Sequence, residues 1–331
     1  MSTHQTTSPP TGRITLVLLA IVAGAVAFPW HTVNERWVLG VAVVAVIVLL
    51  ARWRGLPLTT VLRRRLALLR PNRGARRADE SVTDVRTTAL LRVTPPLDAS
   101  DVLPLPLIAG YTERYGLRAD AVRVTSRDST SEVGTRERET WIGLTLSAAD
   151  NLAALQARSA QIPLDETAEV AARRLADHLR EAGWTAALAA PDDIPTPYPR
   201  SAHETWVGID QGNGDYIAAY GVKVDTALPN TLAAIWSYPV REVWTALEVS
   251  GAGADQTLAV ACAFRTDASP VAGGPLPGLT SKSGIQRAAL AALDPLSNER
   301  LDGHVALPEA LLLDRLRWAT TVAQQPSAAV R

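Results

Sequence analysis

The sequence has few of the groups that usually carry chemistry. Its 331 residues contain one methionine and one cysteine, Cys262, which excludes an intrachain disulfide framework. Because Cys262 lies in the apolar run 258–264, it is predicted to be a buried structural thiol. His178 is expected on the solvated face of its helix. The five histidines are scattered, and none has metal-ligand spacing with another: His4, His31, His178, His203 and His304.

Complete ligand-binding motifs are also missing. Residues 273–284 are glycine-rich like a phosphate loop, but they lack its Gly-Lys-Ser/Thr ending and include two prolines. Residues 210–215 resemble a calcium loop, but Gly212 occupies a ligand position and no glutamate closes the loop. Asp192 and Asp193 stand between prolines and are more typical of a turn than of a metal site. The sequence therefore predicts no catalytic, cofactor-binding or metal-binding residue.

Lysine is rare, with two lysines against 31 arginines, and charge is unevenly distributed. The formal net charge is zero. Residues 1–78 nevertheless contain 11 arginines and one acidic residue, a net charge of +10. Residues 79–331 contain 20 arginines and two lysines against 32 acidic residues, a net charge of −10. Because an acidic body is repelled by phosphates, binding of DNA or RNA is disfavoured.

Two uncharged apolar segments, 14–28 and 37–51, lie near the N-terminus. With their flanking residues, each would form a helix about 24–25 Å long, at the short end of the membrane-spanning range. The sequence therefore predicts a two-helix transmembrane hairpin. Three tryptophans bracket the segments like an interfacial aromatic belt and are the predicted membrane anchors: Trp30, Trp37 and Trp53. The alternative is a signal peptide cleaved after residues 25–27.

A basic flank follows the second apolar segment. Residues 52–77 contain nine arginines and no acidic residue, so the positive-inside rule places this flank, the following domain and the N-terminus in the cytoplasm. Residues 56–70 are predicted to form an amphipathic helix along the membrane. Six arginines of this flank form the predicted lipid-facing basic collar: Arg52, Arg54, Arg63, Arg64, Arg65 and Arg70.

Ala20 and Gly24, in the first apolar segment, have the small-xxx-small spacing that lets a second helix pack closely. The alternative is that alanine and glycine are simply common here. The predicted parts of the chain are a disordered N-terminus (1–12), two transmembrane helices (13–54), a basic juxtamembrane helix and linker (55–81), a cytoplasmic α+β domain (82–325) and a tail (326–331).

The domain is predicted to be α+β because hairpins alternate with helices. Strands are predicted at 86–93, 120–127, 140–147, 184–189, 204–210, 216–224, 241–250 and 257–265. Helices are predicted at 101–115, 165–182, 230–236, 283–293 and 308–319. The turn signals at 211–215 and 251–255 each predict a β-hairpin. Residues 268–284 are predicted to form a surface loop. Most of the six tryptophans after residue 81 are expected in the core.

The order of these features resembles a known family. The resemblance rests on two spans, an arginine-rich flank and the strand sequences at 85–93, 205–209 and 215–222. The chain resembles the EccE component of the mycobacterial ESX type VII secretion membrane complex. The resemblance implies a non-enzymatic inner-membrane subunit, peripheral in a large hetero-oligomer with EccB, EccD and the motor ATPase EccC. Such a subunit would support the export of small helical substrate proteins. The chain length and general likeness favour the paralogue that is linked to iron and zinc acquisition.

Two other function classes stay open from the sequence. One is a membrane-tethered enzyme, such as a sugar-nucleotide transferase that uses Asp210 or the Asp192–Asp193 pair. The other is a membrane-anchored signalling or scaffold protein. Metal-dependent nucleotide binding would favour the enzyme, whereas recovery of a large membrane assembly would favour the secretion subunit.

Overall fold

The computed structural model describes residues 85–96, 101–130, 135–159, 162–199, 201–307 and 313–321, with residues 52–53, 56–57 and 65 from the preceding part. Contacts divide the chain into two compact units, Met1–Arg76 and Arg77–Arg331. The predicted boundaries at residues 82 and 325 stay predictions.

In the first unit, β1 (Arg52–Trp53) pairs with β2 (Leu56–Pro57) in an antiparallel ladder. The prediction that a helix begins at residue 56 is therefore wrong. Leu56 and Pro57 are extended and paired, and proline is a poor residue for helix continuation because it lacks an N–H. Arg65 is helical and exposed, as expected. The apolar segments 14–28 and 37–51 lie outside the described residues. Within the described part of the chain, no helix is both long and apolar enough to cross a membrane.

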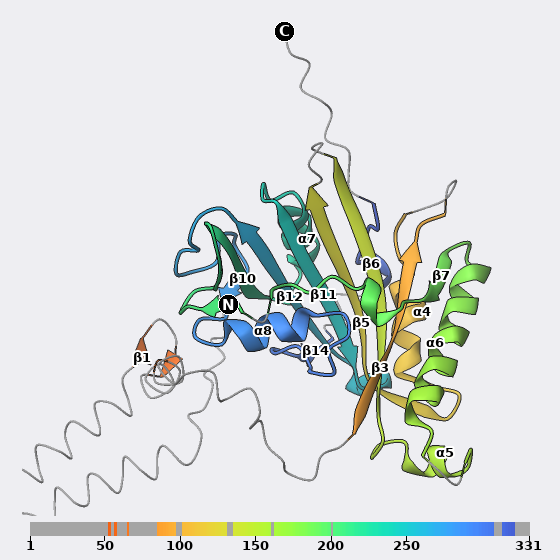
Figure 1. Ribbon diagram of the computed structural model, residues 1–331. Coiled ribbons are helices and arrows are strands. Elements are labelled where there is room, and N and C mark those ends of the chain that lie inside the picture. Colours follow the sequence, from red (N-terminus) through yellow and green to blue (C-terminus); the bar gives the residue numbers. More distant parts are fainter. Residues whose placement is uncertain are drawn as a thin grey trace, which may run out of the picture. The chain divides into compact units, whose positions relative to one another are not determined.

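The second unit is built on one antiparallel sheet (Figure 1). Its strand order is β7-β3-β6-β5-β11-β12-β10-β9-β8; in addition, β4 pairs with β5, β13 with β10 and β14 with β12. The strands are β3 (Arg86–Thr94), β4 (Glu113–Arg114), β5 (Leu117–Thr130), β6 (Arg136–Ser147), β7 (Thr185–Leu188), β8 (His203–Glu204), β9 (Ile209–Gly212), β10 (Asp215–Val222), β11 (Glu242–Ser250), β12 (Thr257–Thr266), β13 (Leu279–Ser281) and β14 (Val305–Ala306). The predicted α+β class is confirmed, because the second unit combines helices with a large antiparallel sheet.

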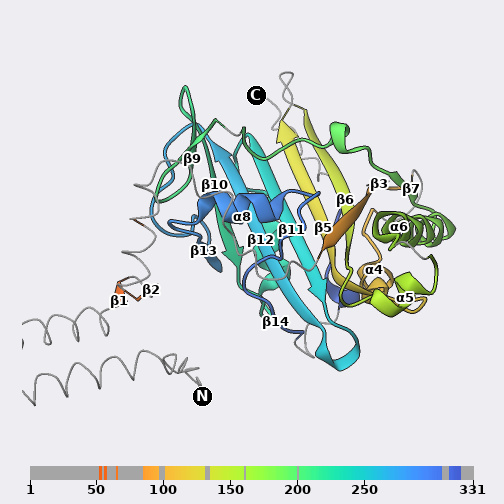
Figure 2. The same ribbon diagram turned by 60° about the horizontal axis from the view of Figure 1, so that its bottom comes forward.

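Helices lie on both faces of this sheet. The α-helices are α4 (Leu105–Ala109), α5 (Leu152–Gln156), α6 (Leu164–Glu181), α7 (Leu228–Trp236) and α8 (Gln286–Leu293). Short 3-10 turns are η1 (Gly110–Thr112), η2 (Pro191–Asp193), η3 (Gly253–Asp255) and η4 (Leu313–Arg315). Figure 2 shows α8 lying across β10, β12 and β11, while α6 runs beside β3 and β7.

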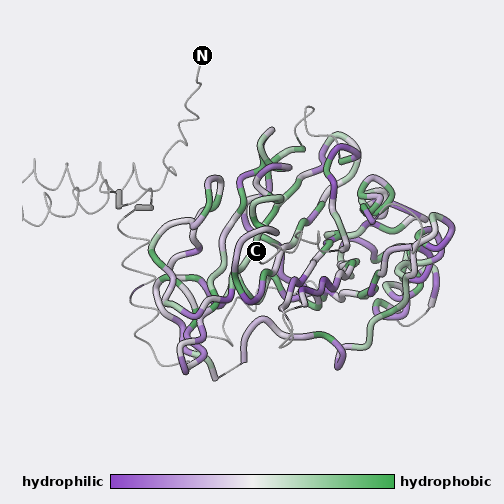
Figure 3. Tube along the Cα trace, turned by 90° about the horizontal axis from the view of Figure 1, so that it is seen from above, coloured by the Kyte–Doolittle hydropathy of each residue, from purple (hydrophilic) through white to green (hydrophobic). Residues whose placement is uncertain are grey.

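The two faces of the sheet differ in chemistry because successive side chains of a strand point to opposite sides. On β11, Val243, Leu247 and Val249 join the core cluster that contains residues of α6 and α7; we call this side the apolar face. Trp244 and Ala246 join the cluster that contains residues of α8. Glu242 and Glu248 are an even number of positions from Trp244 and Ala246, so they lie on the same side as these residues. We call this side the polar face. Figure 3 shows hydrophobic and hydrophilic residues interspersed along the coloured part of the chain trace.

Helix α6 confirms the predicted helix 165–182 to within a residue at each end. Ala172, Leu175 and Leu179 are fully buried on its inner side. The helix ends at Glu181, and Gly183 follows two residues later with a φ of +89°, which suits glycine. The amide N–H groups of Gly183 and Trp184 donate to the carbonyl oxygens of Arg180 and Leu179, both at 2.9 Å. This closes the C-terminal turn in the manner of a Schellman motif.

Two charged pairs lie on the outer side of α6. Arg173 Nη2 lies 2.7 Å from Glu169 Oε2, one helical turn away. Asp177 pairs with Arg180. The side chains of both pairs are exposed, so each pair contributes little to the free energy of unfolding.

Most predicted strands and both hairpins are confirmed, but four segments differ. Residues 101–115 contain α4, η1 and the short strand β4 instead of one helix, and Pro104 and Pro106 have no N–H with which to extend the helix upstream. Residues 204–210 are not one strand, because a turn between Thr205 and Gly208 separates β8 from β9; the Thr205 N–H donates to the Gly208 carbonyl at 2.8 Å.

The other two differences lie towards the C-terminus. Within the predicted loop 268–284, β13 pairs with β10. Of the predicted helix 308–319, residues 313–315 form η4 and the chain then extends. Trp318 accepts a backbone hydrogen bond from Leu103 at 2.9 Å, and Ala319 bridges to Val102, so this segment pairs with residues 101–103 instead of coiling.

Candidate functional site

Glu248 is the centre of a buried charge cluster on the polar face. Its side chain is fully buried, and Arg123 lies directly opposite on β5 with its Nε 2.7 Å from Glu248 Oε2. His304 Nε2 lies 2.9 Å from Glu248 Oε1, and the Leu301 N–H donates to the same oxygen at 3.1 Å. Since an isolated buried carboxylate is very costly, these partners make the position of Glu248 possible.

Arg123 connects this cluster to the chain after α8. Its Nη1 donates to the carbonyl oxygens of Ala292 at 2.8 Å, Asp294 at 3.3 Å and Ser297 at 3.4 Å. Its Nη2 donates to the carbonyl of Glu299. One guanidinium therefore satisfies the C-terminal end of α8, where helix carbonyls lack intrahelical partners, and holds residues 294–299 against the sheet.

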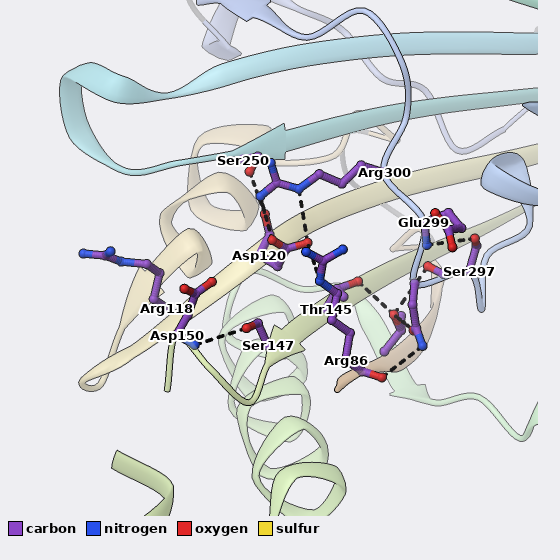
Figure 4. Close-up of polar contacts among 12 residues, drawn as sticks. Arg86, Arg118, Asp120, Thr145, Ser147, Asp150, Ser250, Ser297, Glu299 and Arg300 are labelled. Carbon is purple, nitrogen blue, oxygen red and sulfur yellow. Dashed lines mark hydrogen bonds and ion pairs between the residues drawn. The ribbon is translucent and has the colours of Figure 1, made fainter. Parts of the chain in front are cut away.

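A second cluster surrounds Asp120 on β5 and includes Arg300 and Arg86. Arg300 Nη2 lies 2.7 Å from Asp120 Oδ1, and Arg86 Nε lies 3.7 Å from Asp120 Oδ2. The Ser250 hydroxyl donates to the Asp120 carbonyl at 2.6 Å. Figure 4 shows Arg300 and Arg86 converging on Asp120 from different segments. The two clusters together hold residues 294–304 on the polar face, and we call this segment the strap.

Burial and pairing act in opposite directions on the carboxyl groups beneath the strap. Burial raises the pKa of Glu248, but the hydrogen bond from His304 and the charge of Arg123 outweigh it, so the pKa is lower than its ordinary value. The pKa of Asp294 is raised, mainly by burial. Glu248 is therefore held as a carboxylate.

Thr257, His304 and Glu248 form a hydroxyl–imidazole–carboxylate arrangement that the sequence analysis missed. Thr257 Oγ1 lies 3.0 Å from His304 Nδ1, and the other ring nitrogen faces Glu248. The same order of groups activates a nucleophile in serine hydrolases. Here Thr257 also donates to the Ser250 carbonyl at 3.3 Å, and Glu248 is shared with Arg123. The contacts therefore fasten β14 and the strap to the sheet.

A row of alternating charges crosses the polar face near Glu242, at the other end of β11 from Ser250. It follows six strands and their loops, and we call it the ionic row: Arg92, Glu139, Arg127, Glu242, Arg265, Asp215, Arg241 and Asp267. Neighbouring partners are 2.5–3.5 Å apart. Its central carboxylate, Glu242, is nearly buried, whereas Arg92 and Asp267 at its ends are exposed. Four positive and four negative groups leave the row neutral.

Two tryptophans support the middle of the ionic row. Trp141 and Trp244 stack with ring centroids 6.2 Å apart, and Arg127 lies 5.7 Å above the Trp244 ring. Trp244 Nε1 donates to Glu242 at 2.8 Å. The expectation that most tryptophans belong to the core is confirmed, because four are buried: Trp141, Trp184, Trp244 and Trp318.

The residues that the sequence rejected as ligands are placed as structural groups. Asp210 Oδ1 accepts the Gly212 N–H at 2.8 Å within the β9–β10 turn. Asp192 and Asp193 lie exposed in η2. Across the described ranges, no group of three or more histidine, cysteine or acidic residues is arranged to hold a metal ion. Cys262 is fully buried, as predicted, and burial raises the pKa of its thiol.

His178 differs from its prediction as a plain surface residue. It is half-buried on α6, and its Nδ1 lies 2.6 Å from the Tyr111 hydroxyl. The residues predicted to act in the membrane mostly lie outside the described part: Trp30, Trp37, Ala20, Gly24, Arg54, Arg63, Arg64 and Arg70. Of the others, Arg52 and Trp53 form β1, and Arg65 is exposed. Their membrane roles stay predictions.

Comparison with known proteins places this domain among secretion proteins. Residues 135–222, from β6 to β10, match a family described as "Putative type VII ESX secretion system translocon, EccE". The ESX-3 secretion system protein EccE3 of Mycobacterium tuberculosis strain H37Rv is 52% identical over 318 residues, which are 95% of this chain and 94% of that protein. EccE3 of Mycolicibacterium smegmatis is 52% identical over 295 residues, 88% of this chain and 90% of its own.

Proposed function

Because this chain belongs to the EccE family of type VII ESX secretion systems, we propose that it acts as a structural subunit of the membrane complex of such a system. One structural observation supports a structural role. The charged side chains of the polar face bind one another and the strap, and the ionic row is neutral. Groups that are engaged in this way position chain segments, because Glu248, Asp120 and the carboxylates of the ionic row already have their counter-charges.

The proposal includes a place in the bacterial inner membrane. Residues 14–28 and 37–51 span it as a hairpin anchored by Trp30, Trp37 and Trp53, and the collar arginines contact anionic headgroups. The second unit and the N-terminus then face the cytoplasm. Partners are EccB-, EccC- and EccD-type subunits. The ESX-3 names of the relatives favour the iron- and zinc-acquisition paralogue.

Recovery of the complex tests this function. The tagged full-length chain is purified in mild detergent from a mycobacterial host, and the co-purifying subunits and secreted substrates are measured. Gly24→Leu adds bulk where a partner helix approaches, so it is expected to reduce both recovery and secretion. The control changes Asp192, Asp193 and Asp210 to Asn, and it is expected to leave both unchanged. Secretion lost only in the control would refute the structural role.

A second candidate function follows from the Thr257–His304–Glu248 arrangement. If this group catalyses a hydrolysis, Thr257→Val removes the hydroxyl while keeping the shape of the side chain, and secretion would stop although the complex stays intact. The structural role predicts instead that a Thr257→Val strain with an intact complex still secretes, since secretion should follow assembly in every variant. Measuring assembly and secretion side by side in the Thr257→Val strain separates the two functions.

A further inference from the structure

An exposed aromatic ring with two arginines beside it lies where the β4–β5 hairpin meets α6. The hairpin turns at Tyr115 and Gly116, between the paired residues Arg114 and Leu117. Tyr115, whose side chain is 46% exposed, lies against Arg174 of α6. Val170, one helical turn before Arg174, is 43% exposed on the same side of the helix. We call Arg114, Tyr115, Val170 and Arg174 the basic-aromatic patch.

Tyr115 adopts an unfavourable backbone conformation. Its φ is +56°, and the φ of Gly116 is +70°. A two-residue hairpin turn with two positive φ angles favours Asn, Asp or Gly at its first position. A bulky side chain at positive φ is uncommon because its Cβ crowds the backbone. Tyr115 remains 46% exposed despite this strain, and such strain often occurs at functional positions.

The two arginines of the patch differ from their neighbours because they have no acidic partner among the residues that the structure describes. Arg118 pairs with Glu113, Arg173 with Glu169 and Arg180 with Asp177. Within the described residues, no carboxylate lies within 4.0 Å of Arg114 or Arg174. Their guanidinium carbons lie 5.4 Å and 4.6 Å from the centre of the Tyr115 ring. A guanidinium stacked on a ring keeps its N–H edge available for a carboxylate.

The patch rests on a rigid platform. Tyr111, which is 4% exposed, lies beneath it with its hydroxyl 2.6 Å from His178 Nδ1. The rings of Tyr115 and His178 stack, with their centroids 6.5 Å apart and an interplanar angle of 27°. The guanidinium carbon of Arg114 lies 5.1 Å from the centre of the Tyr111 ring. Ordering these groups in advance lowers the entropic cost of binding, and tyrosine and arginine are the residues that most often dominate interfaces.

We propose that the basic-aromatic patch is a docking site for an acidic segment of another protein subunit, with a carboxylate between Arg114 and Arg174 and an apolar side chain on Tyr115 and Val170. The inference rests on the proposed function, because it assumes that the chain works within an assembly. An anionic membrane is the weaker occupant. A flat anionic surface would face a large part of the domain, whose residues 79–331 carry a net charge of −10 and repel it, whereas a short acidic segment contacts only the patch with its two arginines.

Matched variants of the full-length chain test the patch. Tyr115→Asn removes the ring but suits the turn, and Arg174→Glu reverses one charge. Arg173→Glu is the control, because it makes the same charge change at the adjacent, already paired position. Each tagged chain is purified in mild detergent from the mycobacterial host, and recovered partner subunits are quantified. The first two variants are expected to lose recovery about fivefold or more, and the control less than about twofold.

Thermal melting of the same samples separates binding from folding. Tyr115→Asn is expected to melt no lower than the wild type, since asparagine tolerates positive φ. Equal recovery for Arg174→Glu and Arg173→Glu, or full recovery for Tyr115→Asn, would overturn the docking site. If the wild-type chain itself recovers no secretion subunit, the proposed function is refuted. If all variants recover the subunits as well as the wild type does, only the docking site is refuted.

A photo-reactive phenylalanine analogue at position 115 identifies what lies on the ring. Illumination of the host membranes is expected to link it to a peptide that carries aspartate or glutamate. Cross-linking to lipid alone, or to a peptide without acidic residues, would overturn the proposal. Reversing the charge of the mapped acidic residue in the Arg174→Glu strain should restore most of the lost, about fivefold, recovery of partner subunits.

Discussion

The two faces of one sheet hold their covering segments by different physical means. On the apolar face, α6 packs through fully buried residues such as Ala172, Leu175 and Leu179. On the polar face, the strap is held by Arg123, Arg300 and the groups that surround Glu248. The first kind of contact is non-directional and scales with buried area. The second depends on geometry, since each buried charge requires its partner.

This difference predicts how each face responds to damage. A smaller side chain on the apolar face leaves a cavity, and the cost grows with the cavity volume. Loss of one charged partner on the polar face leaves the other partner buried without its counter-charge. The apolar face also has a comparable charged feature, the buried Asp128–Arg138 pair, in which Arg138 also donates to the Ala319 carbonyl at 2.8 Å. It likewise positions a chain segment on the sheet.

The largest effect is expected for Arg123→Ala. It leaves Glu248 buried without its main counter-charge and frees the carbonyls after α8, so the free energy of unfolding should fall by about 3–5 kcal/mol. Arg92→Ala, at the exposed end of the ionic row, is the control and should cost less than about 1 kcal/mol. Urea unfolding followed by circular dichroism measures both. Equal losses would show that burial does not set the strength of these pairs.

Leu175→Ala on the apolar face should follow, with a loss of about 3 kcal/mol in the free energy of unfolding from lost burial and the remaining cavity. Val170→Ala on the same helix removes a half-exposed side chain and should cost well under about 1 kcal/mol. The same denaturation measurement applies. A loss for Leu175→Ala larger than that for Arg123→Ala would reverse the ranking of the two faces.

The pH dependence of stability should differ between wild type and Glu248→Gln. The pKa of Glu248 is lower in the folded protein than its ordinary value of 4.5. The carboxylate therefore contributes stability above that ordinary value, and the contribution is lost as the pH falls through the folded-state pKa. The difference between wild type and variant in urea midpoint should be largest near neutral pH and shrink on acidification. A difference that stays constant with pH would contradict the charge-based account of the strap.

The smallest effect is expected at the surface of α6. Arg173→Ala removes the exposed pair with Glu169, which is worth about 0.3–0.5 kcal/mol. The loss should disappear at about 1 M salt, because ions screen exposed pairs. Salt should change the Arg123→Ala loss much less, since that pair is buried. Comparable salt sensitivity in the two variants would remove the distinction between surface and buried pairs.

Secondary structure was predictable where local signals agreed. Helix 165–182 was recognisable because its apolar residues recur at helical spacing and Gly183 marks the end. The hairpins at 211–215 and 251–255 were recognisable from their turn residues. Segment 204–210 was misassigned because its apolar alternation hides a turn. At Gly208, an added Cβ would lie 2.9 Å from the Ile217 carbonyl oxygen, a contact that no local pattern reveals.

The sites were less predictable than the elements. His304 and Thr257 looked unremarkable because their partners are distant in sequence: His304 lies 56 positions from Glu248 and 47 from Thr257. Tyr115 gave a weak signal, since Tyr-Gly is an unusual dipeptide for a two-residue turn. Its importance depends on Arg174, which only the packing of α6 brings over the ring.

By itself, the sequence determined the α+β class, the separation of a basic N-terminal part from an acidic domain, and the family resemblance, because these follow from composition, periodicity and order along the chain. Only the tertiary structure decided the strand order, which face receives the strap, and which charges meet. Arg123 and Glu248 are 125 positions apart, and they are opposite one another because β5 pairs with β11. Pairing between distant strands depends on the register and packing of the whole sheet, and local residue patterns do not encode it.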